Sequence, residues 1–219
     1  MEAGKLTAIA STQNLVRLNC PWSIPSRFRR KRMKTLLELC EGKQKILDVG
    51  GTPEFWSLLP VPMNRITLLN PEERYYMNYR VMKADGRDMA ILRDGEYDLV
   101  VSHSTIEHVG TPKDQKRMAD EIRRVGRTYY VQSPHYDILV EPHFWIPLFQ
   151  LMPRSMRIWI LANVPTFAYQ HRVPIETATA FVDSVRLIPP WEFTDLFPDA
   201  EIVTERFCGL PYSQIAIKR

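Results

Sequence analysis

The stretch "KILDVGGTPEFW", Lys45–Trp56, decides the fold class. A short apolar run ends in the carboxylate of Asp48, and Gly50 and Gly51 follow almost directly. Glycine lets the backbone turn tightly, approach a ligand closely and present its amide groups. An acid and two glycines at the tip of a strand are therefore typical of a site for a small-molecule cofactor. The turn is nevertheless poor in glycine, because Thr52, Pro53 and Glu54 follow the two glycines. Pro53 also stiffens it.

Outward from this stretch, strand-like and helix-like segments alternate. The strand-like runs are residues 45–50, 65–70, 80–85, 97–104 and 127–134, and the helix-like stretches are residues 53–60, 71–80 and 112–125. Residues 112–125 are clearly amphipathic, with Met118, Ile122 and Val125 on one side. Such alternation predicts βα units on a parallel sheet.

The C-terminal third follows a different pattern. Residues 201–207 and 213–219 alternate like strands, which predicts an antiparallel hairpin that closes the sheet. Residues 134–187 are rich in aromatic residues and interrupted by prolines, and they are too long for a plain loop. We expect a helical insertion here, serving as a lid or substrate-binding segment. The expected organisation is a basic helical segment at 1–44 and a main domain at 45–219.

Composition is that of an ordinary globular protein. The 219 residues are 45% hydrophobic and 25% charged, enough for one substantial domain. The three cysteines are scattered and odd in number, which argues against a disulfide framework or a CxxC zinc site. No signal peptide or membrane span is visible, and a cytoplasmic location is expected.

Positive charge is concentrated near the N-terminus. Residues 1–44 carry nine Lys and Arg against three Asp and Glu, with the run "SRFRRKRMK" at Ser26–Lys34. Such a run can attract nucleic acid or an anionic membrane. Met33, Leu36 and Cys40 follow a helical apolar stripe, so the favoured interpretation is a solvated helix face.

Polar residues at the predicted strand ends are the candidate ligands of a cofactor. In an open α/β sheet, ligands bind beyond the carboxyl ends of the strands. The candidates are Asp48, Gly50, Gly51, Asn70, Asp85 and Ser102.

The order of the motifs "ILDVGG", "ITLLN", "KADGRDM", "YDLVVSHSTIEHV" and "YYVQSP" resembles the class I S-adenosylmethionine-dependent methyltransferases, in particular their small-molecule branch. The resemblance implies a Rossmann-like, mostly parallel seven-stranded sheet with helices on both faces and S-adenosyl-L-methionine as cofactor. It assigns the methionine end of the cofactor to Asp48, Gly50 and Gly51, and the ribose to Asn70. Asp85 would hold the adenine, and Ser102 would line the cofactor beneath the methyl group.

Two departures from the family pattern weaken the expected cofactor site. The first loop lacks a further glycine, and Asn70 stands where an acid is usual. An amide accepts a hydrogen bond without the strength of a charged acceptor. Weaker affinity, or a changed position of the cofactor, is the physical expectation.

The segment "VQSPHYDILVEPHFWIPLFQLMPRSMRIWI" is similar to an insertion in bacterial methyltransferases near sugar and cell-envelope pathways. This resemblance implies a small-molecule or glycan-type acceptor. Apolar anchors beside basic residues would also suit a lipid-linked acceptor, with contact at the inner membrane face. The favoured alternative is a plain cap over the substrate pocket.

Histidines are the candidate bases, since a hydroxyl acceptor must lose a proton near neutral pH. His135 and His143 lie where the insertion would meet the acceptor, with Glu141 available to orient one of them. His103 is the third candidate. His108 is interpreted as a packing residue. One branch of the family binds a divalent metal through an acid three positions before Glu107, but Ser104 stands there, so no metal is expected.

Three functions compete. The leading hypothesis is a methyltransferase acting on oxygen or nitrogen of a small-molecule or glycan-type acceptor. The alternative is a catalytically inactive methyltransferase-like domain that serves as a binding or scaffold module, motivated by Asn70 and the short first loop. A nucleic-acid methyltransferase is supported only by the basic run, and "SHST" replaces the NPPY-like tetrapeptide such enzymes carry. The oligomeric state is not predicted.

Overall fold

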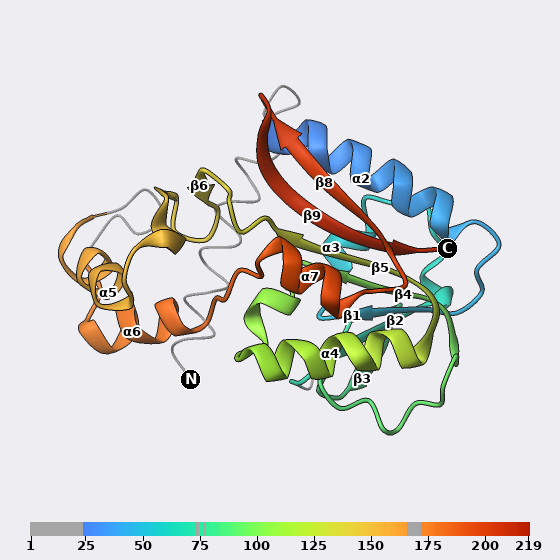
Figure 1. Cartoon of the computed structure of the whole chain (residues 1–219). Helices are drawn as coiled ribbons and strands as arrows, with labels where there is room; N and C mark the ends of the chain where they lie inside the picture. Colours follow the sequence, from blue (N-terminus) through green and yellow to red (C-terminus); the bar gives the residue numbers. More distant parts are fainter. Residues whose placement is uncertain (1–23, 73–74, 77, 166–171) are drawn as a thin grey trace.

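The structure, a computed structural model, describes residues 24–72, 75–76, 78–165 and 172–219, with side chains from residue 31 onward. Its core is a seven-stranded sheet of order β3-β2-β1-β4-β5-β9-β8 (Figure 1). The neighbouring strands β3, β2, β1, β4 and β5 run parallel to one another. Strand β9 lies between β5 and β8 and is antiparallel to both. The strands are β1 (Ile46–Val49), β2 (Ile66–Asn70), β3 (Arg80–Lys83), β4 (Tyr97–His103), β5 (Gly126–Pro134), β8 (Glu201–Phe207) and β9 (Leu210–Lys218). The predicted Rossmann-like sheet and the C-terminal hairpin are confirmed.

Two helical layers cover the sheet because successive side chains of a strand point to opposite faces. Ile46 packs with α2 (Ile24–Cys40) and α3 (Pro53–Trp56). The next residue, Leu47, packs on the other face with α4 (Pro112–Val125) and α7 (Pro190–Leu196). Figure 1 shows these helices on either side of the sheet. The carboxyl ends of the parallel strands are thereby left to form a site.

The start of α4 is fixed by a capping box. The Thr111 hydroxyl accepts from the amide of Asp114, and the Asp114 carboxylate accepts from the amide of Thr111. Pro112 follows at the first helical position. These residues define where α4 begins, and its bounds agree with the amphipathic stretch expected at residues 112–125.

Thr111→Ala is expected to lower the free energy of unfolding by about 1 kcal/mol, since the amide of Asp114 loses its side-chain partner. The measurement is urea denaturation followed by circular dichroism. Thr179→Ala is the matched control, because the exposed Thr179 hydroxyl only donates back to the carbonyl of Ile175 within its own helix. An equal loss in both variants would contradict this account of the cap.

Two helices that the sequence predicts differ in the structure: one is shorter, and the described residues of the other are not helical. The first of them, residues 53–60, forms only the single turn of α3, because Pro60 and Pro62 prevent its continuation. Described residues of the stretch 71–80 form no helix and lead into β3. Tyr76 and Tyr79 pack against the core, but they do not make a continuous apolar stripe.

The insertion after β5 has a core of its own, which confirms the predicted helical insertion. It comprises β6 (Val140–Glu141), β7 (Ile146–Pro147), η3 (Phe149–Leu151), α5 (Arg154–Asn163) and α6 (Ile175–Asp183). Its buried side chains are Phe144, Phe149, Ile158, Leu161, Ala178, Phe181 and Val182. In Figure 1 it stands to one side of the sheet. Residues 166–171 of the expected lid lie outside the described part.

The basic segment is only partly described. Residues 1–23 and the side chains of residues 24–30 lie outside the described part. Leu36 and Cys40 of the expected apolar stripe are buried against the sheet. Arg32 of the basic run forms an ion pair of 2.7 Å with the buried Glu205 of β8. No helix among the described residues is long and apolar enough to cross a membrane.

Candidate functional site

The turn after β1 requires its glycines. Gly50 has a φ of +82°, and a Cβ built on it would lie 2.3 Å from Cγ2 of Thr105 in the loop after β4. A Cβ on Gly51 would lie 1.8 Å from the Asp48 carboxylate. The bare backbone of this turn is therefore packed between the ends of β1 and β4. A side chain at either position would force the turn to move.

Asp48 is a buried acid with one unpaired oxygen. Its side chain is 1% exposed, and Oδ2 accepts a hydrogen bond of 2.6 Å from the indole of Trp56. Oδ1 has no hydrogen-bond partner among the described residues. Burial raises the pKa of Asp48 to about 7, and the Trp56 hydrogen bond offsets only part of that rise. A cationic or hydrogen-bonding ligand would complete the site.

Asp48 should make the stability of the free protein depend on pH. Because its pKa rises from 3.8 to about 7 on folding, Asp48 holds its proton more tightly in the folded chain. The folded state is then favoured at low pH and loses stability as pH rises from about 4 to about 7. Asp48→Asn should remove this loss, so the stability of the variant relative to wild type should rise by about 2 kcal/mol between pH 5.5 and pH 8.

Urea denaturation of both proteins at the two pH values checks this prediction. The comparison of variant with wild type cancels the contributions of the other acids. Equal pH dependence in the two proteins would mean that Asp48 is ionised in the folded state throughout.

Asn70 at the end of β2 holds the first turn. Its side-chain amide donates a hydrogen bond of 3.0 Å to the carbonyl of Gly51. An acid could not make this bond, because a carboxylate has no hydrogen to donate. The amide at this position therefore has a structural reason that the sequence did not reveal. Its role toward a ribose stays a prediction.

Asp85 follows β3, next to the end of β2. Its carboxylate accepts from Nε and Nη2 of Arg87, and the Arg87 amide donates to the same group. The Arg87 hydrogen bond lowers the pKa of Asp85, so the acid is ionised and oriented. Arg87 also reaches the carbonyl of Val109 after β4. Its role toward an adenine stays a prediction.

Ser102 completes the group at the strand ends. It is fully buried in β4, and its hydroxyl donates to the carbonyl of Val49 at 3.2 Å. The structure thus brings the six predicted cofactor residues to one edge of the sheet, at the ends of β1 to β4. The bare turn and the unpaired oxygen of Asp48 fit a ligand with an amino-acid end, as in S-adenosylmethionine.

Two of the three predicted bases lie away from the cluster described next. The ring of His103 stacks against Phe55, with ring centroids 4.9 Å apart, and its Nε2 lies 3.5 Å from Arg32. His135 is 4% exposed, and its Nδ1 accepts from the amide of Asp137. Burial lowers the pKa of His135.

His143 joins a cluster that bridges the insertion and the sheet domain. Its Nδ1 lies 2.5 Å from the carboxylate of the buried Glu141, which also accepts from the amides of His143 and Phe144. Its Nε2 lies 3.1 Å from Nε2 of His108, in the loop after β4. Burial lowers the pKa of His143, but the hydrogen bond to Glu141 and the charges of Glu141 and Glu107 outweigh it and raise the net value.

Glu107 lies beside this pair with no exposed surface. Neither of its carboxylate oxygens makes a hydrogen bond of normal length and angle within the described residues. Burial raises the pKa of Glu107 to about 7, which His143 and the nearby Ser133 hydroxyl offset only in part. The ligand atoms of Glu107, His108 and His143 all lie within 4.8 Å of one another. From the sequence, His108 beside Glu107 was interpreted as a packing residue, and nothing in the motifs "IEHV" and "EPHF" indicated that they meet.

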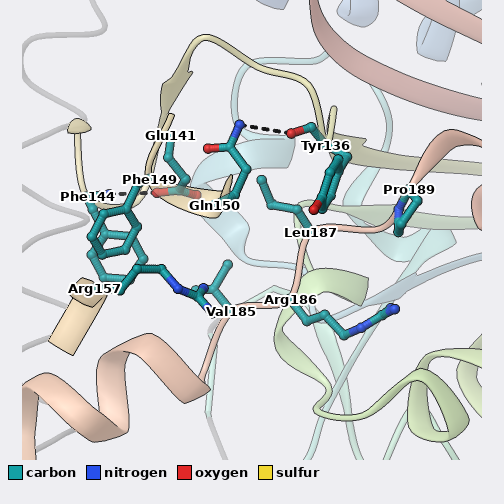
Figure 2. A pocket seen from close by; sticks show the side chains of 10 residues that line it. All are labelled: Tyr136, Glu141, Phe144, Phe149, Gln150, Arg157, Val185, Arg186, Leu187 and Pro189. Carbon is teal, nitrogen blue, oxygen red and sulfur yellow. Dashed lines mark hydrogen bonds between the residues drawn. The ribbon is translucent and has the colours of Figure 1, made fainter. Parts of the chain in front are cut away.

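A cavity of about 300 Å³ adjoins this cluster between the insertion and the segment that follows α6 (Figure 2). Its lining residues are Tyr136, Glu141, Phe144, Phe149, Gln150, Arg157, Val185, Arg186, Leu187 and Pro189. Oε1 of Gln150 and Nε of Arg157 are buried there without a hydrogen-bond partner in the described chain. Aromatic faces beside unpaired polar atoms suit a hydroxylated ligand.

The sequence comparisons find similarity to a methyltransferase domain over part of the chain. Residues 61–128 match the family model described as "Methyltransferase domain". Two uncharacterized proteins of Mycobacterium tuberculosis, from strains CDC 1551 and H37Rv, are 32% identical over 75 residues. This match covers 33% of the chain and 26% of each relative, so it spans about a quarter of their length.

Solved structures, one of them described as a SAM-dependent methyltransferase, are similar to this chain in fold. The PH0226 protein of Pyrococcus horikoshii OT3 has a TM-score of 0.54 at 16% identity, over 91% of this chain and 94% of that one. A SAM-dependent methyltransferase of Archaeoglobus fulgidus has a TM-score of 0.51 at 13% identity, over 88% and 94%. The N-terminal domain of EvdMO1 with SAH bound has a TM-score of 0.52 at 14% identity, over 87% and 80%. The same domain was also solved in the presence of SAH and D-fucose.

Proposed function

We propose that this chain, which has the class I S-adenosylmethionine-dependent methyltransferase fold and the matching domain, methylates an oxygen or nitrogen of a small-molecule or glycan-type acceptor. The observation that carries the proposal is the first turn. Its two glycines leave no room for a Cβ, and they lie against a buried acid with an unpaired oxygen. An ordinary structural turn would not require an unpaired acid at its base, because an unsatisfied buried polar group is costly.

The chain's own residues would hold the cofactor as follows. Asp48 pairs with the ammonium of its methionine end, and the Gly50–Gly51 backbone allows close approach. Asn70 accepts from the ribose through its oxygen, since its amide nitrogen is bonded to Gly51. Asp85, held ionised by Arg87, accepts from the exocyclic amine of adenine. The cofactor supplies an electrophilic methyl group, and transfer to a hydroxyl leaves a neutral thioether and one proton.

The acceptor is assigned to the cavity beside the insertion. Phe144 and Phe149 offer apolar faces, while Gln150 and Arg157 offer unpaired polar atoms. A hydroxylated ring such as a sugar satisfies both features, and the structure of EvdMO1 in the presence of D-fucose is consistent with this class.

A lipid-linked acceptor is a finer form of the same proposal. The exposed apolar side chains on the insertion support it, namely Trp145, Leu148, Leu151, Met156, Trp159 and Ile175. Such a surface could contact the inner face of a membrane while the sugar enters the cavity. A cytoplasmic location is part of this proposal.

The proton of a hydroxyl acceptor is assigned to the cluster that His143 forms with His108 and Glu107. Glu141 both lines the cavity and orients His143, so acceptor and base are adjacent. A base within hydrogen-bond reach contributes about 100- to 10,000-fold to the rate of proton-coupled transfer. His135 is the second candidate base and His103 the third.

A catalytically inactive binding or scaffold domain is the second candidate function. The side chain of Thr105 packs directly on Gly50, and the described cavity lies beside the insertion rather than over the first turn. If this packing closes the cofactor site, the cavity alone would serve as a binding site.

Calorimetric titration with S-adenosylmethionine and S-adenosylhomocysteine separates the two functions. The enzyme proposal expects micromolar binding by wild type and at least 30-fold weaker binding by Asp85→Ala. Acceptors are then screened with methyl-labelled cofactor and a panel of hexoses and deoxyhexoses that includes D-fucose. No binding of either cofactor form by wild type would leave only the scaffold function.

A further inference from the structure

We propose that Glu107, His108 and His143 form a binding site for one divalent transition-metal ion, which joins the insertion to the sheet domain. The three ligand atoms lie within 4.8 Å of one another. Two come from η2 (Ile106–His108), the short 3-10 helix after β4, and the third from the turn between β6 and β7. Two histidines with one carboxylate are the ligand set of many iron and zinc enzymes.

The hydrogen bonds of the two histidines fix their tautomers. His108 Nδ1 lies 3.1 Å from the carbonyl of Ser184, and a carbonyl can only accept, so Nδ1 carries the hydrogen. His143 Nδ1 faces the Glu141 carboxylate at 2.5 Å and therefore carries a hydrogen as well. In the neutral form of both rings, the two Nε2 atoms hold lone pairs that point toward each other. A cation between them, either a proton or a metal ion, must relieve this contact.

The separation of the two nitrogens suits a shared metal ion. They lie 3.1 Å apart. Two nitrogens that each lie about 2.0–2.1 Å from one metal ion are separated by about 2.9–3.4 Å at octahedral or tetrahedral angles. The observed distance falls within this interval.

Glu107 decides between a proton and a metal ion. A proton shared by the histidines would leave the buried Glu107 with no hydrogen bond of normal length and angle among the described residues, and only the Ser133 hydroxyl nearby. A metal ion satisfies the two nitrogens and the carboxylate together. The unpaired acid, with no exposed surface, is thus the second and independent observation that points to a ligand.

The surroundings have the features of a metal site. Metal-bound histidines usually donate their other ring hydrogen to a carboxylate or a backbone carbonyl, and Glu141 and Ser184 supply one of each. Imidazole ligands favour Zn²⁺, Fe²⁺, Co²⁺ or Ni²⁺ over Mg²⁺. His108 is exposed, which leaves room for water or an acceptor oxygen as a further ligand. This inference departs from the sequence-based expectation of no metal, which rested on Ser104 and could not foresee His143.

The role of the metal rests on the proposed function, whereas its binding does not. A hydroxyl of the acceptor that coordinates the metal would lose its proton more readily, because the cation stabilises the alkoxide. In that case the cluster acts through coordination and His143 holds the metal. The same ion would fix the insertion against the sheet domain.

The test is Co²⁺ titration of the full chain after removal of metals with EDTA, followed by visible absorption and by competition with a chromophoric chelator. Wild type should bind one equivalent with d–d bands typical of nitrogen and oxygen ligands. His143→Gln and His108→Gln should each weaken binding at least 100-fold, and Glu107→Gln at least 10-fold. Glu141→Gln removes the charge, and its single acceptor oxygen cannot serve both the His143 ring and the amides of His143 and Phe144, so it should weaken binding about 10- to 100-fold. His103→Ala is the control, and its affinity should equal that of wild type.

Several results would overturn the inference. One is the absence of stoichiometric Co²⁺ binding by wild type. Another is equal Co²⁺ affinity in wild type and the histidine variants. Circular dichroism confirms that each variant is folded, and the exposed position of His108 makes its variant the safest. Binding of S-adenosylhomocysteine is measured in parallel with EDTA present. Cofactor binding without metal binding would overturn this inference alone, and metal binding without cofactor binding would overturn only the proposed function.

Discussion

Gly50→Val is expected to lower the affinity for S-adenosylhomocysteine at least 100-fold. The substituted residue would need the left-handed φ of +82°, and its Cβ would meet Thr105 at 2.3 Å. The turn must then move away from the loop after β4, and the backbone at the methionine end of the cofactor moves with it. Calorimetry on the variant and on wild type measures the loss.

Gly209→Ala is the matched control for backbone strain. Gly209 has the same φ of +82°, but no atom lies within 4 Å of its built Cβ. It should lose stability without losing cofactor affinity. A rescue test adds Thr105→Gly to Gly50→Ala, which removes the atoms that the new Cβ would meet. Equal cofactor affinity in Gly50→Val and wild type would show that the cofactor does not use this turn.

His143→Ala is expected to slow methyl transfer about 100- to 10,000-fold with little change in cofactor affinity. The cluster it belongs to adjoins the cavity proposed for the acceptor, whereas the residues proposed to hold the cofactor lie at the ends of β1 to β4. Glu141→Gln should give a smaller loss, because the His143 ring stays in place, although glutamine carries no charge and has one acceptor oxygen instead of two. Initial rates are measured with labelled cofactor and whichever acceptor of the screen is methylated.

Asp183→Asn is the control for damage to the insertion. Asp183 forms an exposed ion pair with Arg154 within the insertion, and exposed pairs contribute little stability. Its rate should match wild type. If His143→Ala also matched wild type, proton removal would have to be reassigned to His135 or His103.

The sheet was predictable because its residues follow simple local rules. The runs at β1, β2, β4 and β5 are almost wholly buried, as their continuous apolar sequences predict for parallel strands covered on both faces. The helix α4 has the predicted bounds, since its capping box and amphipathic stripe are both local. The stretch 71–80 was mispredicted because no such local signal separates a helix from an irregular segment there.

Only those features of the candidate site that follow from the order of the strands were predictable from the sequence. Asp48, Asn70 and Asp85 had to meet, because the carboxyl ends of parallel strands share one edge. The bond from Asn70 to Gly51 could not be foreseen, since it depends on side-chain orientation. His108 and His143 are 35 positions apart and meet only because the insertion folds back onto the loop after β4.

The most direct test of the account is a crystal structure of the protein with S-adenosylhomocysteine. We expect the amino-acid end of the ligand against Gly50 and Gly51, with its ammonium at Asp48, and the adenine beside Asp85. The sulfur should point toward the cavity that the insertion lines. Ligand bound elsewhere, or crystals that take up none at millimolar concentration, would contradict the assignment of this edge of the sheet as a cofactor site.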